Sequence, residues 1–384
     1  MKEKKMIRVG VNATALLSPR TGIGKYVFRL GKEFLASGEI SPRFFYANHW
    51  SNELRQDPLP NMASIKTAIK KFVPHPYVLS RLATQAFFSA GLRKDPVDLY
   101  HDPNYLAYRF RGPTVITVHD LSWIRHPDTH PKDRLKVMDR YFPSSLERSS
   151  AIITDCEFVK DELVEVFGIS PAKVHSVLLG VSSLFRPVAS GECQETLAAH
   201  GLEYGQYFLS VGTLEPRKNV VTLIDAFSKL RPEVQKNYPL VLVGMRGWLT
   251  NSIEARMRPL VEKGVVKTLG YVADAQMPML YSGATAFLFP SLYEGFGLPP
   301  LEAMACGAPV IVSNGSSLPE VVGDVGVSLD PMDVDGVADA MRRAVEDGAW
   351  RVESSVKGVQ RASSFSWQRT GAETTMVYRK LLNV

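Results

Sequence analysis

The chain has 384 residues, of which 45% are hydrophobic and 22% are charged, and this length is enough for two domains of ordinary size. The composition excludes the collagen-like, low-complexity and disordered classes. The three cysteines, Cys156, Cys193 and Cys306, are odd in number and far apart in the sequence. They therefore predict neither a disulfide framework nor a metal knuckle, and they favour a reducing, cytoplasmic setting.

The charge is unevenly distributed along the chain. The net charge is +6, and residues 1–195 hold 27 Lys and Arg against 20 Asp and Glu, whereas residues 196–384 hold 18 against 19. This excess predicts an anionic partner for the first half, such as a phosphorylated acceptor or a lipid surface. The sequence has no zinc knuckle, RNA-recognition aromatic pair or basic helix with a heptad partner, so we expect no nucleic acid partner.

A glycine loop follows the first predicted strand, which covers residues 7–11. Gly22 and Gly24 lie in this loop, directly before Lys25 and a predicted helix over 26–35. In a doubly wound sheet such a loop lies at the ligand-binding edge, so it is either a flexible turn or a segment that closes over a phosphate and an acceptor. The third glycine of a dinucleotide fingerprint is missing, which argues against a nicotinamide-dependent oxidoreductase.

Residues 65–94 form a basic stretch without any Asp or Glu. Its basic residues are Lys66, Lys70, Lys71, Arg81, Arg93 and Lys94. Apolar spacing predicts one helix that ends before Pro74 and a second helix that begins near Tyr77. The stretch is either a contact with a membrane surface or a lipid diphosphate, or a helix pair packed on the sheet with solvated lysines.

The first half contains four more predicted strands, over 43–47, 97–101, 114–120 and 151–154, and then a last strand and turn over 173–181. His119 and Asp120 form the polar pair at the end of the strand 114–120. Because strand ends in such sheets face the ligand cleft, both are candidate site residues, although a buried neutral histidine with a backbone partner would give the same pattern. Asp155 or Cys156 is expected to cap the next helix, and the polar residues 190–195 are expected in a linker.

The second half begins again with a strand, over 207–212. Arg217 and Lys218 follow it in a loop, before a predicted helix over 223–230. A guanidinium beside an ammonium supplies the positive charge that a leaving diphosphate requires, and a nearby anion would relieve their repulsion. The alternative is an ordinary basic pair on the surface.

The stretch 284–312 combines two predicted strands, a glycine-rich loop and a helix. Glu294 lies in the loop and Glu302 lies about one turn inside the helix, which Pro299 and Pro300 are expected to start. We hypothesise that Glu302 accepts hydrogen bonds from a ribose diol, that Glu294 holds sugar hydroxyls, and that the helix start receives a diphosphate. The alternative is an ordinary first-turn acid and a surface loop acid.

The string from Glu294 to Val310 reads Glu-Gly-Phe-Gly-Leu-Pro-x-Leu-Glu-Ala-Met-Ala-x-Gly-x-Pro-Val, where x is any residue. It resembles the donor-site signature of family 4 glycosyltransferases of the GT-B fold. The resemblance covers nearly the whole chain and implies an α/β protein with two Rossmann-like, doubly wound domains that face each other across a cleft. Residues 1–188 would form the acceptor-side domain, 189–364 would bind a nucleotide sugar, and a C-terminal helix over 365–384 would cross back onto the first domain.

The same resemblance implies a set of site residues. The implied catalytic residues are His119, Asp120, Arg217, Lys218 and Glu294. The implied donor-binding residues are Gly212, Arg217, Lys218, Gly244, Tyr271, Val272, Glu294, Gly295, Phe296, Gly297, Leu298 and Glu302. The implied phosphate or acceptor loop contains Gly22, Gly24 and Lys25. We expect no cofactor and no metal, because Asp333-x-Asp335, the metal-binding pattern of another glycosyltransferase class, stands at a predicted helix start where capping explains it.

The resemblance also implies a reaction, which is transfer with retention at the anomeric carbon. The run from His119 to Trp123 is similar to members that act on mannose or rhamnose. We therefore expect transfer of mannose from GDP-mannose to a glycan or polyprenyl-diphosphate-linked acceptor in surface polysaccharide or O-antigen synthesis. The alternatives are a UDP- or dTDP-sugar donor, a nucleotide-sugar epimerase or phosphorylase, and a non-catalytic sugar-nucleotide-binding protein. The expected location is the cytoplasm, with residues 65–94 contacting the inner face of the plasma membrane.

Overall fold

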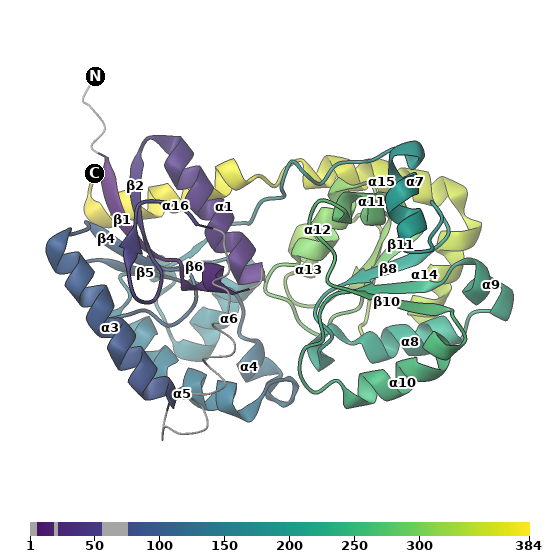
Figure 1. Ribbon diagram of the computed structural model, residues 1–384, viewed down its shortest axis with the longest axis horizontal. Coiled ribbons are helices and arrows are strands. Elements are labelled where there is room, and N and C mark those ends of the chain that lie inside the picture. The colour runs from purple at the N-terminus through teal and green to yellow at the C-terminus, as the bar shows by residue number, and fades with distance from the viewer. Residues whose placement is uncertain (1–5, 19–21, 56–75) are drawn as a thin grey trace.

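The computed structural model describes residues 6–18, 22–55 and 76–384. It contains two sheets, one of seven strands and one of six, each with helices on both faces (Figure 1). We call the seven-stranded sheet and its helices the first lobe, and the six-stranded sheet and its helices the second lobe. Two parallel α/β sheets are the architecture that the sequence predicts.

The sheet of the first lobe has the strand order β3-β2-β1-β4-β5-β6-β7, and its described pairings are parallel except for β2 with β3. The strands are β1 (Ile7–Asn12), β2 (Ile40–Phe45), β3 (Trp50–Ser51), β4 (Leu99–Asp102), β5 (Thr114–Val118), β6 (Ala151–Thr154) and β7 (Val174–Ser176). Every residue of β4, β5 and β6 is buried, as expected for strands covered on both faces. The order reverses between β1 and β4, which is where doubly wound sheets bind ligands.

The sheet of the second lobe has the order β10-β9-β8-β11-β12-β13, and its described pairings are all parallel. The strands are β8 (Phe208–Val211), β9 (Leu240–Val243), β10 (Val266–Gly270), β11 (Ala286–Phe289), β12 (Val310–Ser313) and β13 (Val327–Leu329). Here the order reverses between β8 and β11. The carboxyl ends of these two strands therefore meet at the place where a ligand is expected.

Helices cover both sheets. Those that follow strands of the first sheet are α1 (Gly22–Ser37), α3 (Pro76–Lys94), α4 (Ser122–Arg125), α5 (Lys132–Arg148) and α6 (Glu157–Phe167). Those of the second lobe are α7 (Ser190–Ala199), α8 (Val220–Ser228), α9 (Pro232–Asn237), α10 (Asn251–Glu262), α11 (Met277–Ser282), α12 (Leu298–Ala305), α13 (Leu318–Val322), α14 (Val334–Glu346) and α15 (Gly348–Ala362). The last helix is α16 (Trp367–Leu382). No helix in this described part of the chain is long and apolar enough to cross a membrane.

Of two expectations about the region between the lobes, one is wrong. The strand expected in the segment 173–181 is β7, which ends at Ser176; the chain then leaves the sheet and runs along the start of α16, where Val181 forms a bridge with Ser366. The polar residues 190–195 are not a linker but the first turns of α7, which buries Cys193 against the second lobe. The predicted helix before Pro74 lies outside the described residues, whereas the predicted second helix is α3.

Two predicted caps are confirmed. The thiol of Cys156 accepts the Val159 N–H at the start of α6, and the Asp333 carboxylate accepts the Gly336 N–H at the start of α14. Asp333 is therefore engaged in the capping bond that the sequence predicts. No cluster of three or more His, Cys, Asp or Glu side chains within the described ranges is arranged to hold a metal ion.

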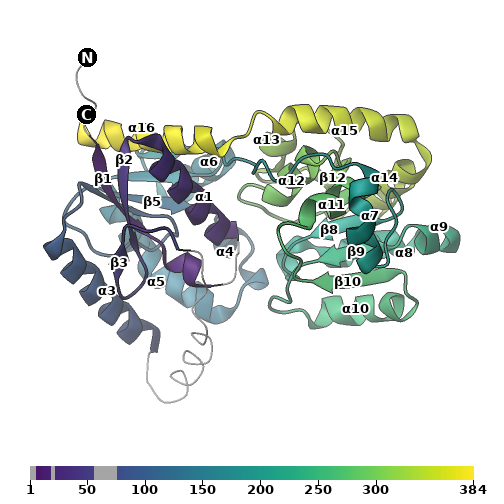
Figure 2. The ribbon, with the colours of Figure 1, turned by 45° about the horizontal axis from the view of Figure 1, so that its top comes forward.

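The C-terminal helix α16 returns to the first lobe, where it lies along α1 and ends near the start of β1 (Figures 1 and 2). The two helices approach closely at Gly371, where an added Cβ would lie 2.7 Å from the Cβ of Glu33. Further along, the Tyr378 hydroxyl lies 2.6 Å from Nδ1 of His101, and both side chains are fully buried. This buried polar contact fixes α16 on the core of the first lobe.

We expect Tyr378→Phe to destabilise the protein by about 1–3 kcal/mol, because it leaves a buried ring nitrogen of His101 without a partner while keeping the packed volume. Denaturant-induced unfolding followed by circular dichroism measures this change. Met376→Ala is the matched control, because Met376 lies on the same helix and is 59% exposed. Equal unfolding midpoints for Tyr378→Phe and the wild type would contradict the assignment.

Candidate active site

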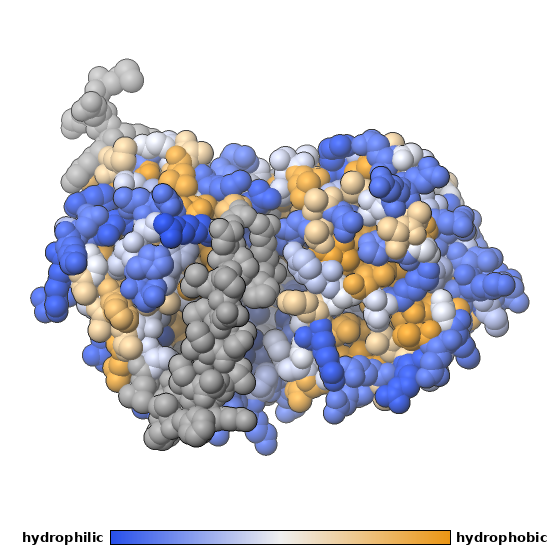
Figure 3. All heavy atoms as spheres, viewed as in Figure 1, coloured by the Kyte–Doolittle hydropathy of each residue, from blue (hydrophilic) through white to orange (hydrophobic). Residues whose placement is uncertain are grey.

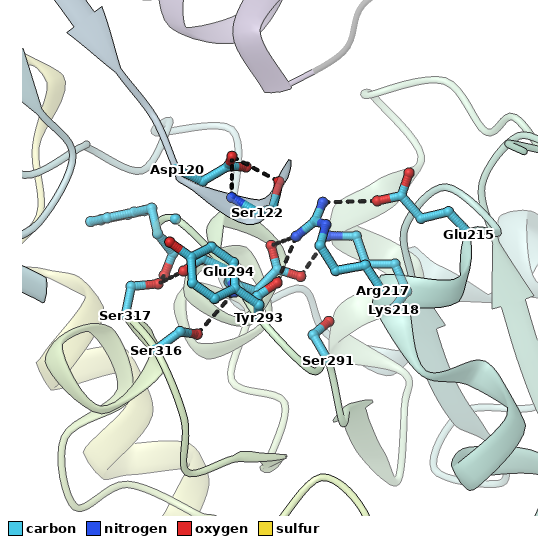
Figure 4. A network of polar contacts seen from close by, with 12 residues as sticks. Asp120, Ser122, Glu215, Arg217, Lys218, Ser291, Tyr293, Glu294, Ser316 and Ser317 are labelled. Carbon is cyan, nitrogen blue, oxygen red and sulfur yellow. Dashed lines mark hydrogen bonds and ion pairs between the residues drawn. The ribbon is translucent and has the colours of Figure 1, made fainter. Parts of the chain in front are cut away.

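A cluster of four charged side chains lies at the carboxyl ends of β8 and β11 (Figure 4). Arg217 and Lys218 stand in a 3-10 turn after β8, and Glu294 stands in the loop after β11. Lys218 Nζ lies 2.6 Å from Glu294 Oε1, and Arg217 Nη1 lies 3.2 Å from Glu294 Oε2. Arg217 Nη2 pairs with Glu215 at 2.8 Å. The sequence predicted the first three residues of this cluster but not Glu215.

The local backbone places the two cations. Pro216 starts the 3-10 turn, and Asn219 ends it in the left-handed conformation with φ 53°. The Asn219 amide donates to the carbonyl oxygens of Pro290 at 3.0 Å and Pro331 at 2.6 Å. These bonds tie the turn to the loop that carries Glu294.

The two cations and two carboxylates of this cluster form ion pairs with each other, and they are largely buried. Glu294 is 7% exposed. Burial alone would raise its pKa, but the charges of Lys218 and Arg217 outweigh burial and hold the pKa of Glu294 below its usual value. Nε of Arg217 is buried without a hydrogen-bond partner among the described residues. The cluster therefore contains two cations, the carboxylates of Glu215 and Glu294, and one N–H donor that bonds to no described residue.

The loop from Glu294 to Gly297 is shaped by two serines and two glycines. The Ser316 hydroxyl accepts the Glu294 N–H at 2.9 Å, and the Ser317 hydroxyl lies 2.9 Å from the Glu294 carbonyl oxygen. Gly297 has φ 106°, a left-handed conformation that favours glycine, and α12 begins directly after it. An added Cβ on Gly295 would lie only 1.9 Å from the carbonyl oxygen of His119 in the first lobe. The loop therefore packs directly against the backbone of the first lobe at His119.

A second buried carboxylate, Glu302, is paired across the two lobes. Its Oε1 lies 3.0 Å from Nζ of Lys25 in α1, and the Tyr281 hydroxyl donates to its Oε2 at 3.1 Å. Burial raises the pKa of Glu302, and the charge of Lys25 opposes this shift. Gly22 and Gly24, which the sequence placed in a loop, lie in the first turn of α1 next to Lys25. The helix begins four residues earlier than predicted.

His119 and Asp120 lie beside the charged cluster, after β5. Nδ1 of His119 is 2.7 Å from Asp155, and Nε2 is 2.9 Å from the carbonyl oxygen of Pro103. Burial lowers the pKa of His119, but the neighbouring Asp155 outweighs it, so the pKa is raised. Both ring nitrogens are engaged in hydrogen bonds. Neither ring nitrogen is therefore open to a ligand in this structure.

Asp120 is an ionised carboxylate. Burial would raise its pKa, but the charge of Arg217 and two hydrogen bonds from Ser122 hold the pKa below its usual value. Asp120 thus links the first lobe electrostatically to the cluster of the second lobe.

Several contacts between the lobes were not predicted. The Leu121 N–H donates to the Tyr293 hydroxyl at 3.1 Å, and that hydroxyl donates to Glu162. Glu320 accepts the N–H groups of Glu157 at 2.9 Å and Phe158 at 2.6 Å at the start of α6. These contacts hold the ends of β5 and β11 together.

The remaining predicted donor-binding residues lie around the ends of β8, β9 and β10. Gly244 has φ 145°, and an added Cβ there would lie 1.9 Å from the carbonyl oxygen of Gly212, so these two glycines allow the backbones to meet. Tyr271 is 60% exposed, whereas Val272 and Phe296 are buried in the core. The chain segments after β8 and β9 thus meet through their backbones, as the two glycines in the sequence suggest.

The ion cluster and the start of α12 in the second lobe thus face the strand ends of the first lobe. The family model "Glycosyltransferase Family 4" matches residues 20–183, and the model "Glycosyl transferases group 1" matches residues 195–362. The chain belongs to glycosyltransferase family 4.

The chain is similar to named members of this class over its whole length. It is 35% identical to O-antigen chain mannosyltransferase B of Escherichia coli over 377 residues, which cover 94% of this chain and 97% of that protein. The structure of sucrose-phosphate synthase from Thermosynechococcus elongatus superposes with a TM-score of 0.77 at 22% identity, covering 98% of this chain and 99% of that one. Anabaena HepE in complex with UDP-glucose superposes with a TM-score of 0.72 at 17% identity, covering 97% and 100%. These two structures confirm the fold.

The His119–Asp155 pair predicts a loss of stability at alkaline pH. A histidine with a raised pKa stabilises the folded state fully below its unfolded value near 6.5, and this contribution is lost as the pH rises through the folded pKa. Burial also raises the pKa of Asp155, but from an unfolded value near 3.8, so the loss of stability that it causes begins at acidic pH. We expect the melting temperature of Asp155→Asn to fall less between pH 6 and pH 9 than that of the wild type.

Thermal unfolding at both pH values measures this difference. Asp139→Asn, an exposed change on α5 of the same lobe, is the control and should fall as the wild type does. A wild-type pH dependence that persists in Asp155→Asn would show that other groups cause it.

Proposed function

We propose that this glycosyltransferase transfers mannose from GDP-mannose, with retention, to a glycan or polyprenyl-diphosphate-linked acceptor in the synthesis of a surface polysaccharide such as O-antigen. The observation that carries this proposal is the buried cluster of Arg217, Lys218 and Glu294 beside the start of α12. The similarity to an O-antigen chain mannosyltransferase along 94% of the chain supports the choice of sugar.

In this proposal the cations hold the diphosphate that leaves with the nucleoside. Arg217 and Lys218 neutralise its negative charge, and Arg217 Nε, which has no partner among the described residues, supplies a hydrogen bond. The backbone N–H groups near Gly297 and Leu298, at the start of α12, add the positive end of the helix dipole. The site thus stabilises charge where the glycosidic bond breaks.

The two carboxylates hold hydroxyl groups of the donor. Glu294 would accept hydrogen bonds from the sugar hydroxyls once the diphosphate has drawn Lys218 and Arg217 toward itself. Glu302 would accept hydrogen bonds from the ribose diol, which would replace the bond from Lys25. Both exchanges keep the buried carboxylates paired, as their burial requires.

Retention is proposed to occur without a covalent intermediate. The bond between the anomeric carbon and the phosphate oxygen breaks, the acceptor oxygen attacks from the same face, and its proton passes to the departing phosphate oxygen. Glu294 is assigned to the hydroxyls of the donor sugar, and Asp120 accepts two hydrogen bonds from Ser122, so the proposal uses neither as a nucleophile. Trapping of a mannosyl-enzyme on either residue would contradict this mechanism.

We further propose that residues 1–188 bind the acceptor, that residues 189–364 bind the donor, and that the protein works in the cytoplasm at the inner face of the plasma membrane. The first half carries the excess positive charge, which suits a diphosphate-linked acceptor. Cys156, Cys193 and Cys306 are unpaired and buried, which suits a reducing compartment.

Binding of nucleotides tests the donor. We expect GDP to raise the melting temperature of the purified protein above the effect of UDP, dTDP, ADP or NAD, because a ligand at 100 times its Kd adds about 2.7 kcal/mol to the folded state. Glu302→Gln should lose most of this shift, since it removes the charge that would hold the ribose. Glu346→Gln, which changes an exposed acid on α14, should keep it.

A shift of the melting temperature with UDP or dTDP alone would mean that the donor carries uracil or thymine in place of guanine. The proposal that the protein is a transferase would then still hold. A shift with NAD alone, or with none of the diphosphates, would contradict the donor site.

An exposed apolar face of α3 supports the proposed contact with the membrane. Leu82 is 63% exposed and Phe87 is 52% exposed, whereas Phe88 on the opposite face is fully buried. Apolar atoms appear along the edge of the first lobe where Figure 1 shows α3 (Figure 3). Arg93 and Lys94 end this helix, and the predicted lysines between residues 66 and 71 lie outside the described residues. An apolar face beside basic residues suits an anionic lipid surface.

We expect the double change Leu82→Ser and Phe87→Ser to reduce sedimentation of the protein with vesicles that contain anionic lipid, because it removes the exposed apolar side chains. Met332→Ser in the second lobe, where Met332 is 65% exposed, is the matched control. Unchanged sedimentation of the double variant would refute a membrane contact through α3.

A further inference from the structure

His130 lies next to the candidate active site, yet neither the sequence motifs nor the proposed donor site uses it. It follows α4 in the first lobe and is only 5% exposed. Its Nε2 lies 3.0 Å from the Ser122 hydroxyl, and that hydroxyl donates to Oδ1 of Asp120 at 2.9 Å. His130 is thus connected through one serine to a predicted catalytic carboxylate.

The protonation of this chain follows from its partners. Asp120 is an ionised carboxylate and only accepts hydrogen bonds, so the single proton of the Ser122 hydroxyl is used toward Asp120. The hydroxyl must therefore accept from His130, and Nε2 carries the ring proton. Burial and the charge of Arg134 lower the pKa of His130 to about 4, so the ring is neutral at pH 7 and Nδ1 has a free lone pair.

This Nδ1 atom is buried and has no hydrogen-bond partner in the described part of the chain. A buried acceptor without a partner is unfavourable, and in native proteins such atoms call for an explanation. A neutral imidazole nitrogen accepts a hydrogen bond from a hydroxyl group. The missing partner is therefore a hydrogen-bond donor that the described part of the chain does not supply.

The second lobe covers the His130 ring with a tryptophan. Trp248, in the loop after β9, lies with its ring centre 6.1 Å from that of His130, and its indole N–H donates to the Thr129 carbonyl oxygen at 2.6 Å. The guanidinium of Arg134 lies 5.8 Å from the same indole ring. Because Trp248 belongs to the second lobe, His130 lies where the two lobes close on each other.

We propose that His130 is an acceptor-binding residue, whose Nδ1 accepts a hydrogen bond from a hydroxyl of the acceptor sugar. This inference rests on the proposed mannosyl transfer. The acceptor fits better than the donor because His130 belongs to the first lobe, whereas Glu294 in the second lobe already matches the hydroxyls of the donor sugar. Ser122 and Asp120 fix the ring so that Nδ1 remains available, and Trp248 covers the bound sugar when the lobes close.

Two substitutions separate this role from a structural one. In His130→Gln the amide nitrogen can still donate to Ser122, but no acceptor remains at the position of Nδ1. In His130→Asn the amide oxygen replaces Nδ1, but the bond to Ser122 is lost. We therefore expect His130→Gln to raise the KM for the acceptor about tenfold, the size of one hydrogen bond, with a much smaller change in kcat, and His130→Asn to raise it less.

The experiment uses the full chain, GDP-mannose and a short mannose oligosaccharide as the acceptor. His49→Gln, which changes an exposed histidine of the first lobe, is the control, and the melting temperature with GDP reports donor binding in each variant. A normal acceptor KM in His130→Gln together with a lower kcat in His130→Asn would assign His130 a purely structural role and overturn the inference. If the wild type transfers no mannose, the proposed function fails and the inference fails with it.

Discussion

The site depends on carboxylates that have been removed from water and must remain paired. Glu294 and Glu302 are both almost fully buried, and an unpaired buried charge costs several kcal/mol. The two are satisfied in different ways. The cations beside Glu294 come from the same lobe, so this part of the site is complete within the second lobe. The cation beside Glu302 is Lys25 of the first lobe, so that pair forms only when the lobes touch. If Glu302 binds the donor as proposed, donor binding and the contact between the lobes are connected through this one carboxylate.

The sequence predicts the fold well because its strands are short apolar runs and its ligand loops follow them. The strand Ala286–Phe289 lies where the apolar run before Pro290 predicts it, and the helix after Gly297 begins at Leu298, one residue before the predicted prolines. A prediction fails where tertiary contacts replace local preference. The polar segment expected as a linker folds as α7, because Cys193 and Leu197 can be buried beneath it. This contact leaves no local signal in the sequence.

The residues of the candidate site likewise fall into those that local motifs predict and those that only tertiary contacts reveal. Arg217, Lys218, Glu294 and Glu302 stand in compact motifs and were predicted, and Glu294 is indeed held by both cations. The proposed roles of these residues in binding a donor stay predictions. Asp155, Glu320 and Tyr293 are single residues whose partners lie far away in the sequence, so no spacing rule could have found them. The predicted position of His119 at a strand end is correct, but its ring faces Asp155 and a backbone carbonyl, and only the three-dimensional arrangement shows this.

The return of α16 has a consequence for the order in which the protein can assemble during synthesis. Tyr378 packs on His101 and Phe34, and both belong to the first lobe, which the ribosome makes first. Until α16 has been synthesised, the face of the first lobe beside α1 is open to water, and Nδ1 of His101 lacks its partner Tyr378. The second lobe has no such requirement, because its described strands and covering helices lie within one continuous segment of the chain. The half of the enzyme that is translated first is therefore the half that is completed last.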